Sequence, residues 1–412
     1  GSLASSIVGA AYKESGKAYS GLELAYDTIL AGTPGIKHRR KVLNKFINIS
    51  DTAAVDGADL VSTIDVFVQD LAERSLKKEL IKDKAYTGVA IVMEVETGDI
   101  KAMVNLDKDS LGRYYEGRNH AIADLLEPGS VFKTASILTA IDDGYIKDTA
   151  NCIVHTGCGI MEMYGAKMRD HNWHRGGYGD INVSRILQVS SNIGVSWLID
   201  KFYGDNPGKF VDGIHRLGLA TDLKLPFPEY EAPRVRHPRK DKTGRHWANW
   251  SKTALPWMSI GYETQVPPIS TLTFYNAIAN GGKMVRPRFV SRIEKDGEVI
   301  KEFPVQVIKN QICKNPASIG VIQDILYKVV HVGLGKTAGS KSFHVSGKTG
   351  TAQKAHNGSY KSGTVDYLLS FCGYFPSGKD ADGNPVKPKY SCIVCIQKSG
   401  LPASGGLMSG QV

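Results

Sequence analysis

The alternation of apolar and polar residues along the chain predicts a fold in which helices and strands are mixed. Apolar residues at helical spacing after Asp65 predict a helix, whose buried face would consist of Val68, Leu71, Ala72, Leu76 and Leu80. Two apolar runs follow at 88–93 and 100–104, with the turn residues 96–99 between them. This order predicts a β-hairpin and a helix that lies across an antiparallel sheet.

The second half of the chain carries further strong patterns. Residues 367–375 and 390–396 are apolar runs that predict two strands. Residues 272–278 and 322–329 repeat apolar side chains at helical spacing and predict two helices. Residues 143–180 are rich in Gly, Tyr and His and predict surface loop with short elements. The expected fold class is therefore α/β in the wide sense, an α+β arrangement of helices on an antiparallel sheet.

The first part of the chain has a weaker pattern. Apolar residues at helical spacing predict one helix there, carried by Leu22, Tyr26, Ile29 and Leu30. The turn residues 32–35 end that helix, and a basic run follows at 37–41. A short polar link containing Asp51 and Gly57 comes next.

These patterns divide the chain into a small unit at 1–56 and a large domain at 57–412. The small unit is either a docking platform or a packing subdomain with a solvated charged face. Gly1-Ser2 resembles a remnant of cloning. A polar insertion at 228–252 carries a cluster of basic residues. This cluster is either a basic lip that draws in an anionic substrate or a solvated loop.

Composition narrows the classes of partner. The 412 residues carry 51 Lys and Arg against 41 Asp and Glu, a formal charge of +10. A basic surface suits nucleic acid, an anionic membrane or an acidic polymer, although it needs no polyanionic partner at all. No nucleic-acid-binding motif occurs, so nucleic acid is not expected as a partner. The chain contains no 18-residue apolar span and no signal peptide.

The cysteines and histidines do not indicate a metal site. Cys392 and Cys395 lie three residues apart in a predicted strand, where they would point to opposite faces. Cys152 and Cys158 could bridge a short loop in an oxidising compartment, and this question stays open. His171 and His174 lie in a Gly-rich loop, and no second pair of metal ligands accompanies them. We expect no metal and no cofactor.

A candidate nucleophile lies at the start of a predicted buried helix. Pro128 and Gly129 break the chain before Ser130, and an apolar run follows at 135–141. A spacing of three places Ser130 and Lys133 on one face of the first helical turn. A lysine can take a proton from serine only when its amine is neutral. Burial and the positive end of a helix dipole both lower the lysine pKa in that direction.

Two more motifs follow in order. Ser190 and Asn192 form a Ser-x-Asn pair in a polar turn between two helical patterns, 60 residues after Ser130. The Lys-Thr-Gly at 348–350 comes 158 residues after Ser190 and precedes two predicted strands. It is expected on an edge strand, where the glycine lets a ligand or helix approach the backbone. Each motif is weak alone, but the ordered triple is a strong signal.

With these motifs the chain resembles the penicillin-binding transpeptidases, which share their fold with serine β-lactamases. The likeness extends into the flanks of the motifs and beyond them: 127–133, 347–352, 62–65 with Gln69 and Glu73, 261–263, and 276–282. Residues 20–27 and 32–35 are similar to the pedestal of class B, monofunctional members, most of all the division-specific septal enzyme. The resemblance implies a five-stranded antiparallel sheet flanked by helices. It makes residues 1–56 a remnant of the pedestal and 57–412 the transpeptidase domain.

The resemblance also assigns roles around the nucleophile. Ser130 would attack the carbonyl of a stem peptide ending in D-Ala-D-Ala and hold the acyl group as an ester. Lys133 would be the base that takes the serine proton. Ser190 would pass that proton to the leaving D-alanine, and Asn192 would hold the substrate amide.

The predicted edge strand would supply the remaining groups. Lys348 would stay cationic and help to keep Lys133 neutral. With Thr349, Gly350 and Thr351 it would bind the substrate, the two hydroxyls contacting the terminal carboxylate. The backbone N–H groups of Ser130 and Thr351 would form the oxyanion hole.

The implied partners are stem peptides, β-lactam antibiotics and membrane proteins of the division machinery. The implied location is the periplasmic face of the bacterial inner membrane. An anchor helix absent from this sequence would hold the protein there. The last helix that family members pack on the sheet would begin where this sequence stops, at about residue 412.

Two other classes remain open. A related hydrolase, either a β-lactamase or a D,D-carboxypeptidase, shares the three motifs. A class A β-lactamase needs a deacylating glutamate, but Glu229, Glu231 and Glu263 do not sit in a pattern that resembles its loop. The other class is not an enzyme but a β-lactam sensor or an inactive division scaffold. A scaffold would usually have lost a residue of the motifs, and here the side chains of all three motifs are intact.

Overall fold

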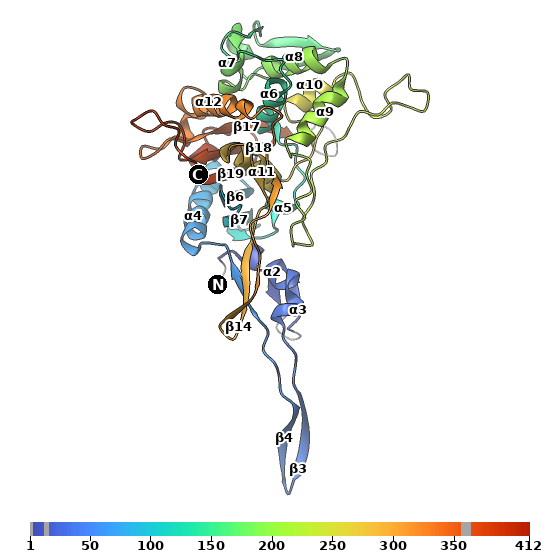
Figure 1. Ribbon diagram of the computed structural model, residues 1–412, viewed down its shortest axis with the longest axis vertical. Coiled ribbons are helices and arrows are strands. Elements are labelled where there is room, and N and C mark those ends of the chain that lie inside the picture. The colour runs from blue at the N-terminus through green and yellow to red at the C-terminus, as the bar shows by residue number, and fades with distance from the viewer. Residues whose placement is uncertain (1–2, 12–15, 356–363) are drawn as a thin grey trace.

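The computed structural model is organised around a six-stranded sheet (Figure 1). It describes residues 3–11, 16–355 and 364–412. All neighbouring strands are antiparallel, and the order is β17-β18-β19-β6-β7-β8. The strands are β6 (Thr87–Glu94), β7 (Ile100–Lys108), β8 (Tyr114–Glu116), β17 (Ser346–Lys354), β18 (Asp366–Phe375) and β19 (Tyr390–Ser399).

The predicted hairpin 88–104 and the two late strands are confirmed as β6, β7, β18 and β19. The Lys-Thr-Gly motif lies on β17 at one edge of the sheet, as expected. The expected count of five strands is wrong, because β8 pairs with the end of β7 as a sixth. β8 is only three residues long, too short to show a period-two pattern in the sequence.

Helices cover both faces of the sheet. α11 (Pro268–Ala279) and α12 (Ala317–His331) confirm the two predicted late helices, and they pack on the face that α5 (His120–Ala123) also covers. α4 (Val66–Asp83) lies across β6 and β7 on the other face, as predicted. The Asp65 side chain caps α4 by accepting hydrogen bonds from two backbone N–H groups of its first turn.

The prediction that Leu71 belongs to the buried face of α4 is wrong, because its side chain is 60% exposed. Gln69 points inward instead and exchanges two hydrogen bonds with the backbone of Met103, at 2.9 and 2.8 Å. Leu76 and Leu80 lie on the same face, seven and eleven residues further on, and are fully buried. The polar Gln69 thus fixes which side of α4 faces the sheet.

A group of helices stands against the sheet at the β17 edge. It consists of η1 (Gly129–Phe132), α6 (Lys133–Asp142), α7 (Val183–Gln188), α8 (Asn192–Tyr203), α9 (Pro207–Arg216) and α10 (Ala254–Ser259). Short elements fill the stretch between α6 and α7, as predicted: β9 (Ile153–His155), β10 (Ile160–Met163), β11 (Ala166–Arg169), η2 (Trp173–Arg175) and β12 (Asp180–Asn182).

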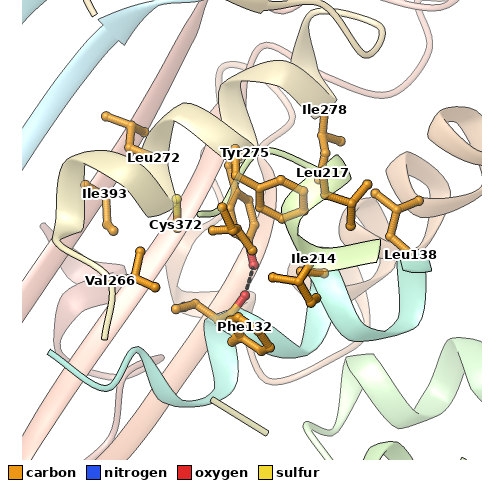
Figure 2. Packing of buried hydrophobic residues seen from close by; sticks show 14 of the residues in the cluster. Phe132, Leu138, Ile214, Leu217, Val266, Leu272, Tyr275, Ile278, Cys372 and Ile393 are labelled. Atoms are coloured by element: carbon orange, nitrogen blue, oxygen red, sulfur yellow. Dashed lines mark hydrogen bonds between the residues drawn. The ribbon is translucent and has the colours of Figure 1, made fainter. Parts of the chain in front are cut away.

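One hydrophobic core joins these helices to the sheet. Figure 2 shows Phe132 and Leu138 beside Ile214, with Tyr275 of α11 reaching toward them. The Tyr275 hydroxyl donates to the backbone oxygen of Val131 at 2.7 Å, also in the buried core. Close packing against α11 therefore fixes η1, the turn that contains Ser130.

The N-terminal part contains the elements α1 (Ser5–Val8), β1 (Ala10–Ala11), β2 (Ala18–Ser20), α2 (Gly21–Ala25), α3 (Asp27–Leu30), β3 (Ile36–Val42) and β4 (Lys45–Thr52). The single predicted helix is two short ones that meet at Tyr26. The expected polar link after the basic run is wrong as far as Thr52. Residues 36–52, which include the basic run, form the β3–β4 hairpin that extends away from the body (Figure 1). Almost every residue of this hairpin is exposed, so its sequence shows no apolar alternation.

The remaining short elements are β5 (Asp59–Ser62), β13 (Met284–Val285), β14 (Val290–Lys295), β15 (Glu298–Glu302), β16 (Val307–Lys309), η3 (Lys336–Ala338) and η4 (Ser409–Gln411). β5 pairs with β14, which joins the start of the large domain to a late segment. Ile7 and Leu22 are buried in the main hydrophobic core. The division at residue 56 stays a prediction, and Gly1 and Ser2 lie outside the described residues.

All six cysteines are free thiols, so Cys152 and Cys158 are not bridged in this structure. Cys392 and Cys395 pack into hydrophobic clusters on opposite faces of the sheet, as predicted. Among the described residues, no helix has both the length and the apolar character needed to span a bilayer.

Candidate active site

The nucleophile candidate lies on a tight turn rather than inside the α-helix. Ser130 belongs to η1, and α6 begins at Lys133. The preceding Gly129 has a φ of 66° and donates its N–H to the oxygen of Gly261 at 3.1 Å. A Cβ at this glycine would lie 2.6 Å from that of Ala352 on β17. Only glycine allows the turn and the edge strand to come so close.

The three sequence motifs meet around one hydroxyl. Ser190 Oγ lies 3.1 Å from Lys133 Nζ and 2.9 Å from Lys348 Nζ. Lys133 Nζ also donates to the Ser190 backbone oxygen at 2.8 Å, and Lys348 Nζ donates to that of Thr349 at 2.8 Å. Lys133 and Lys348, 215 positions apart in the sequence, thus belong to one continuous hydrogen-bonded chain.

Both lysines are fully buried, which disfavours their charged forms. Burial lowers the pKa of Lys133 to about 7, although the nearby charge of Asp170 opposes this shift. Burial also lowers the pKa of Lys348 well below its ordinary value, and the charge of Lys133 lowers it further. A neutral amine near pH 7 is what a general base for a serine requires.

Ser190 has an unusual backbone conformation. Its φ is 55°, a left-handed value that costs a non-glycine residue about 1–2 kcal/mol. Such strain persists where the surrounding structure holds it, commonly at functional sites. The turn that contains Ser190 ends α7 and leads into α8, and Ser191 caps α8 by accepting from the Gly194 N–H at 2.9 Å.

A buried carboxylate that sequence analysis missed holds this turn. Asp170 is fully buried and accepts from the Ser191 hydroxyl at 2.8 Å and from the Ile193 N–H at 3.0 Å. Its position in an apparent surface loop of Gly, His and Trp gave no sign of burial. The adjacent His171 shares a hydrogen bond with the Tyr178 hydroxyl at 2.9 Å. No group of residues suited to a metal occurs in the described ranges.

Asn192 opens α8 at the rim of the site. Its side-chain N–H₂ donates to the backbone oxygen of Arg169 at 2.8 Å, and the side chain is partly exposed. This bond directs one end of the amide toward the loop before Asp170. The hydrogen bond to Arg169 thus fixes the orientation of the Asn192 amide, two residues after Ser190.

The edge strand presents backbone donors to the site. Gln353 donates its N–H away from the sheet, to the Tyr262 hydroxyl at 3.3 Å. Alternate N–H groups of a strand point the same way, so the N–H of Thr351 also faces the open edge. Thr351 Oγ1 accepts from the Gly405 N–H at 3.0 Å, which leaves its own proton available for donation. Thr349 is buried, and Gly350 packs against Val131 of η1.

Comparisons with known proteins identify a family and several relatives. Residues 88–399 match the family model "Penicillin binding protein transpeptidase domain". The chain is 27% identical over 377 residues to the probable peptidoglycan D,D-transpeptidase PenA of Neisseria flavescens, covering 88% of this chain and 85% of that protein. It is 26% identical over 402 residues to the peptidoglycan D,D-transpeptidase FtsI of Escherichia coli K12, covering 95% of this chain but only 60% of that protein.

A solved structure shows the same fold. Penicillin binding protein 3 of Mycobacterium tuberculosis, complexed with ampicillin, has a TM-score of 0.76 and 25% sequence identity, covering 97% of this chain and 82% of that one. The match to the family spans three quarters of the chain and includes all three motifs around Ser190. The chain therefore belongs to the penicillin-binding protein transpeptidase family, whose members are serine acyl transferases.

Proposed function

We propose that the protein is a peptidoglycan D,D-transpeptidase that works through an acyl-enzyme on Ser130. One observation carries this proposal: the Ser190 hydroxyl lies within 3.1 Å of both buried lysine amines, beside the turn of Ser130. This arrangement joins a base, a proton carrier and a second amine in one hydrogen-bonded group, and Lys133 of that group directly follows the turn η1 that contains Ser130. The family match agrees with it.

Acylation begins with the neutral amine of Lys133, which takes the proton from the Ser130 hydroxyl. The oxygen then forms a bond to the carbonyl carbon of the penultimate D-alanine, and the peptide C–N bond breaks. The Ser190 hydroxyl gives its proton to the leaving D-alanine nitrogen and regains one from Lys133. Proton transfer of this kind contributes about 10²- to 10⁴-fold in rate.

The substrate carboxylate sets the charge of the lysine pair. Without it, burial disfavours a cation at Lys348, while Asp170 favours the proton on Lys133. A carboxylate bound by Lys348 and Thr349 favours the cation at Lys348 instead. Repulsion between the two amines then favours neutral Lys133, so binding of the correct substrate prepares the base. The expected cationic Lys348 therefore belongs to the complex with substrate.

The N–H groups of Ser130 and Thr351 stabilise the oxyanion of the tetrahedral intermediate, and loss of one such donor costs on the order of 3 kcal/mol. Asn192 and Gly350 border the bound peptide. An amine from a second stem peptide then attacks the ester carbonyl, forms the cross-link and returns the proton to Ser130 Oγ. A β-lactam mimics the dipeptide and leaves a slowly hydrolysed ester.

We further propose that the enzyme serves septal cell-wall synthesis. The support is the likeness to FtsI of Escherichia coli, which spans 95% of this chain. That role implies a position at the periplasmic face of the inner membrane and contacts with membrane proteins of the division machinery. The resemblance of residues 20–35 to a class B pedestal agrees with it.

A transfer assay tests the activity. A peptide ending in D-Ala-D-Ala is incubated with the protein and an added D-amino acid, and the products are separated by mass. We expect the exchanged peptide to exceed the hydrolysed one. Hydrolysis without exchange would instead identify a D,D-carboxypeptidase, and no reaction with peptide or penicillin would identify an inactive scaffold.

A further inference from the structure

A polar pocket of about 710 Å³ lies next to the active site. Its lining combines the acid that precedes the nucleophile turn, two arginines of the 228–252 insertion and the residue after β17. The main lining residues are Glu127, Arg234, Arg236, Glu263, Gln265 and Ala355. The mechanism uses none of these side chains. Two of them adjoin the site in the sequence, because Glu127 lies three residues before Ser130 and Ala355 directly follows β17.

The direction of the bound peptide leads toward this pocket. In the proposed function the terminal carboxylate lies at Lys348 and Thr349, and the scissile carbonyl lies at the N–H of Thr351. The peptide therefore runs along β17 toward Gln353 and Ala355. Ala355 is four residues beyond Thr351, about 13 Å at about 3.3 Å per residue. The residue that precedes D-Ala-D-Ala, with a long side chain, spans about that distance.

Arg234 supplies a cation on the wall of the pocket. Its backbone is fixed by a two-way pairing with Gln265, at 2.8 and 3.0 Å. Its side chain is 65% exposed and contacts Glu231 at 3.4 Å through one nitrogen. A guanidinium has five donors in a planar fork, so a carboxylate can bind the remaining ones.

Glu263 supplies an anion that is held in a strained conformation. Its φ is 61°, which costs about 1–2 kcal/mol for a residue other than glycine. Its N–H donates to Glu127 Oε1 at 3.1 Å, and its backbone oxygen accepts from Arg236 Nη1 at 3.0 Å. Arg236 also forms an ion pair with the Glu263 carboxylate and lies over the Trp250 ring. This network holds Glu263 in place in the pocket lining, and a third of its side chain is exposed.

We propose that this pocket selects the side chain of the stem-peptide residue that precedes D-Ala-D-Ala, and that it prefers a diamino acid whose side chain ends in an amino-acid head group. The carboxylate of that group binds Arg234, and its ammonium binds Glu263. A side chain that ends in an amine alone, as in lysine, can satisfy only Glu263. The proposal rests on the proposed function and names its substrate class.

Acylation by three donors tests the proposal. Each donor is a stem peptide ending in D-Ala-D-lactate, preceded by meso-diaminopimelate, by its side-chain amide or by L-lysine. Intact mass gives the rate of ester formation on the protein. We expect the diaminopimelate donor to react at least ten times faster than the other two. Arg234→Ala should remove that preference, and Glu263→Gln should slow all three donors.

Arg239→Ala is the matched control, because Arg239 belongs to the same basic insertion but does not line the pocket. It should keep the preference and the rates of the wild-type chain. Equal wild-type rates for the three donors, or an equal loss for all of them in Arg234→Ala, would overturn the proposal. Benzylpenicillin carries neither charge in its side chain. If the protein reacts with benzylpenicillin but shows no preference among the donors, the pocket proposal is rejected and the proposed function stands. If it reacts with neither benzylpenicillin nor any donor, the proposed function is rejected.

Discussion

The buried carboxylate of Asp170 accepts a hydrogen bond from the Ser191 hydroxyl at 2.8 Å. This contact joins a loop before α7 to the turn that carries Ser190, the hydroxyl between the two lysine amines. The same carboxylate raises the pKa of Lys133 against the effect of burial. Asp170 therefore both positions the second motif and adjusts the base of the first.

Asp170→Asn separates these two effects. The amide keeps an acceptor for the turn but removes the negative charge, so we expect slower acylation, by about 10- to 100-fold from the loss of charged hydrogen bonds. The pKa of Lys133 should also fall, which shifts the acid limb of the rate profile to lower pH. Acylation by benzylpenicillin measured from pH 5 to 9 tests this, and a slower reaction with an unshifted profile would leave only the positioning role.

The wild-type enzyme should respond to pH through Lys133. The pKa of Lys133 is lowered to about 7, and only the neutral amine accepts a proton. The second-order rate constant for acylation should therefore rise as the pH increases through about 7 and then level off. Stopped-flow measurements with a chromogenic β-lactam would show this, whereas a flat profile between pH 5 and 8 would assign the base to another group.

Lys133→Met should lower the rate of acylation and raise the stability of the folded chain. Loss of the base should slow acylation by about 10²- to 10⁴-fold. The folded-state pKa of Lys133 is depressed from 10.5 to about 7, so folding requires the wild-type chain to bury an amine that is charged in the unfolded state. This destabilisation is complete below about pH 7 and decreases as the pH rises toward 10.5. The variant should thus unfold at a higher temperature than the wild type at pH 6.5, with a smaller difference at pH 9. Equal differences at both pH values would contradict the linkage.

A pair of glycine variants tests the close approach at the nucleophile turn. Gly129→Ala adds a Cβ at 2.6 Å from Ala352 at a φ of 66°, whereas Gly144→Ala at a φ of 80° meets nothing within 4 Å. Backbone strain alone should cost about 1–2 kcal/mol in Gly144→Ala. The added overlap should raise the cost to about 2–5 kcal/mol in Gly129→Ala, with slower acylation. Equal losses in chemical denaturation would mean that the overlap relaxes freely.

Sequence analysis predicted those helices and strands in which the spacing of apolar residues matches the face that is buried. The β6–β7 hairpin, the strands β18 and β19 and the helices α11 and α12 follow such patterns. The β3–β4 hairpin does not, because its residues face solvent on both sides. Leu71 is the opposite case, an apolar residue that was predicted to be buried and is exposed. The face of α4 that packs on the sheet carries Gln69 instead, whose side chain bonds to the backbone of Met103.

The site was predictable as far as its residues carry recognisable motifs. Ser130, Ser190 and Lys348 could be named from spacing and order, and the structure brings their motifs together. Asp170 could not, because a single aspartate in a polar loop has no pattern of its own. The pocket formed by Arg234 and Glu263 depends on contacts between distant segments, so no local sequence window contains it.

The most direct test of the acyl-enzyme is the intact mass of the purified protein after a few minutes and after several hours with benzylpenicillin, for the wild-type chain and for Ser130→Ala. We predict an adduct of one penicillin that persists for hours and maps to Ser130. The variant should remain folded and form no adduct. An adduct that disappears within minutes while drug is hydrolysed, or one that forms at the normal rate in Ser130→Ala, would contradict this account.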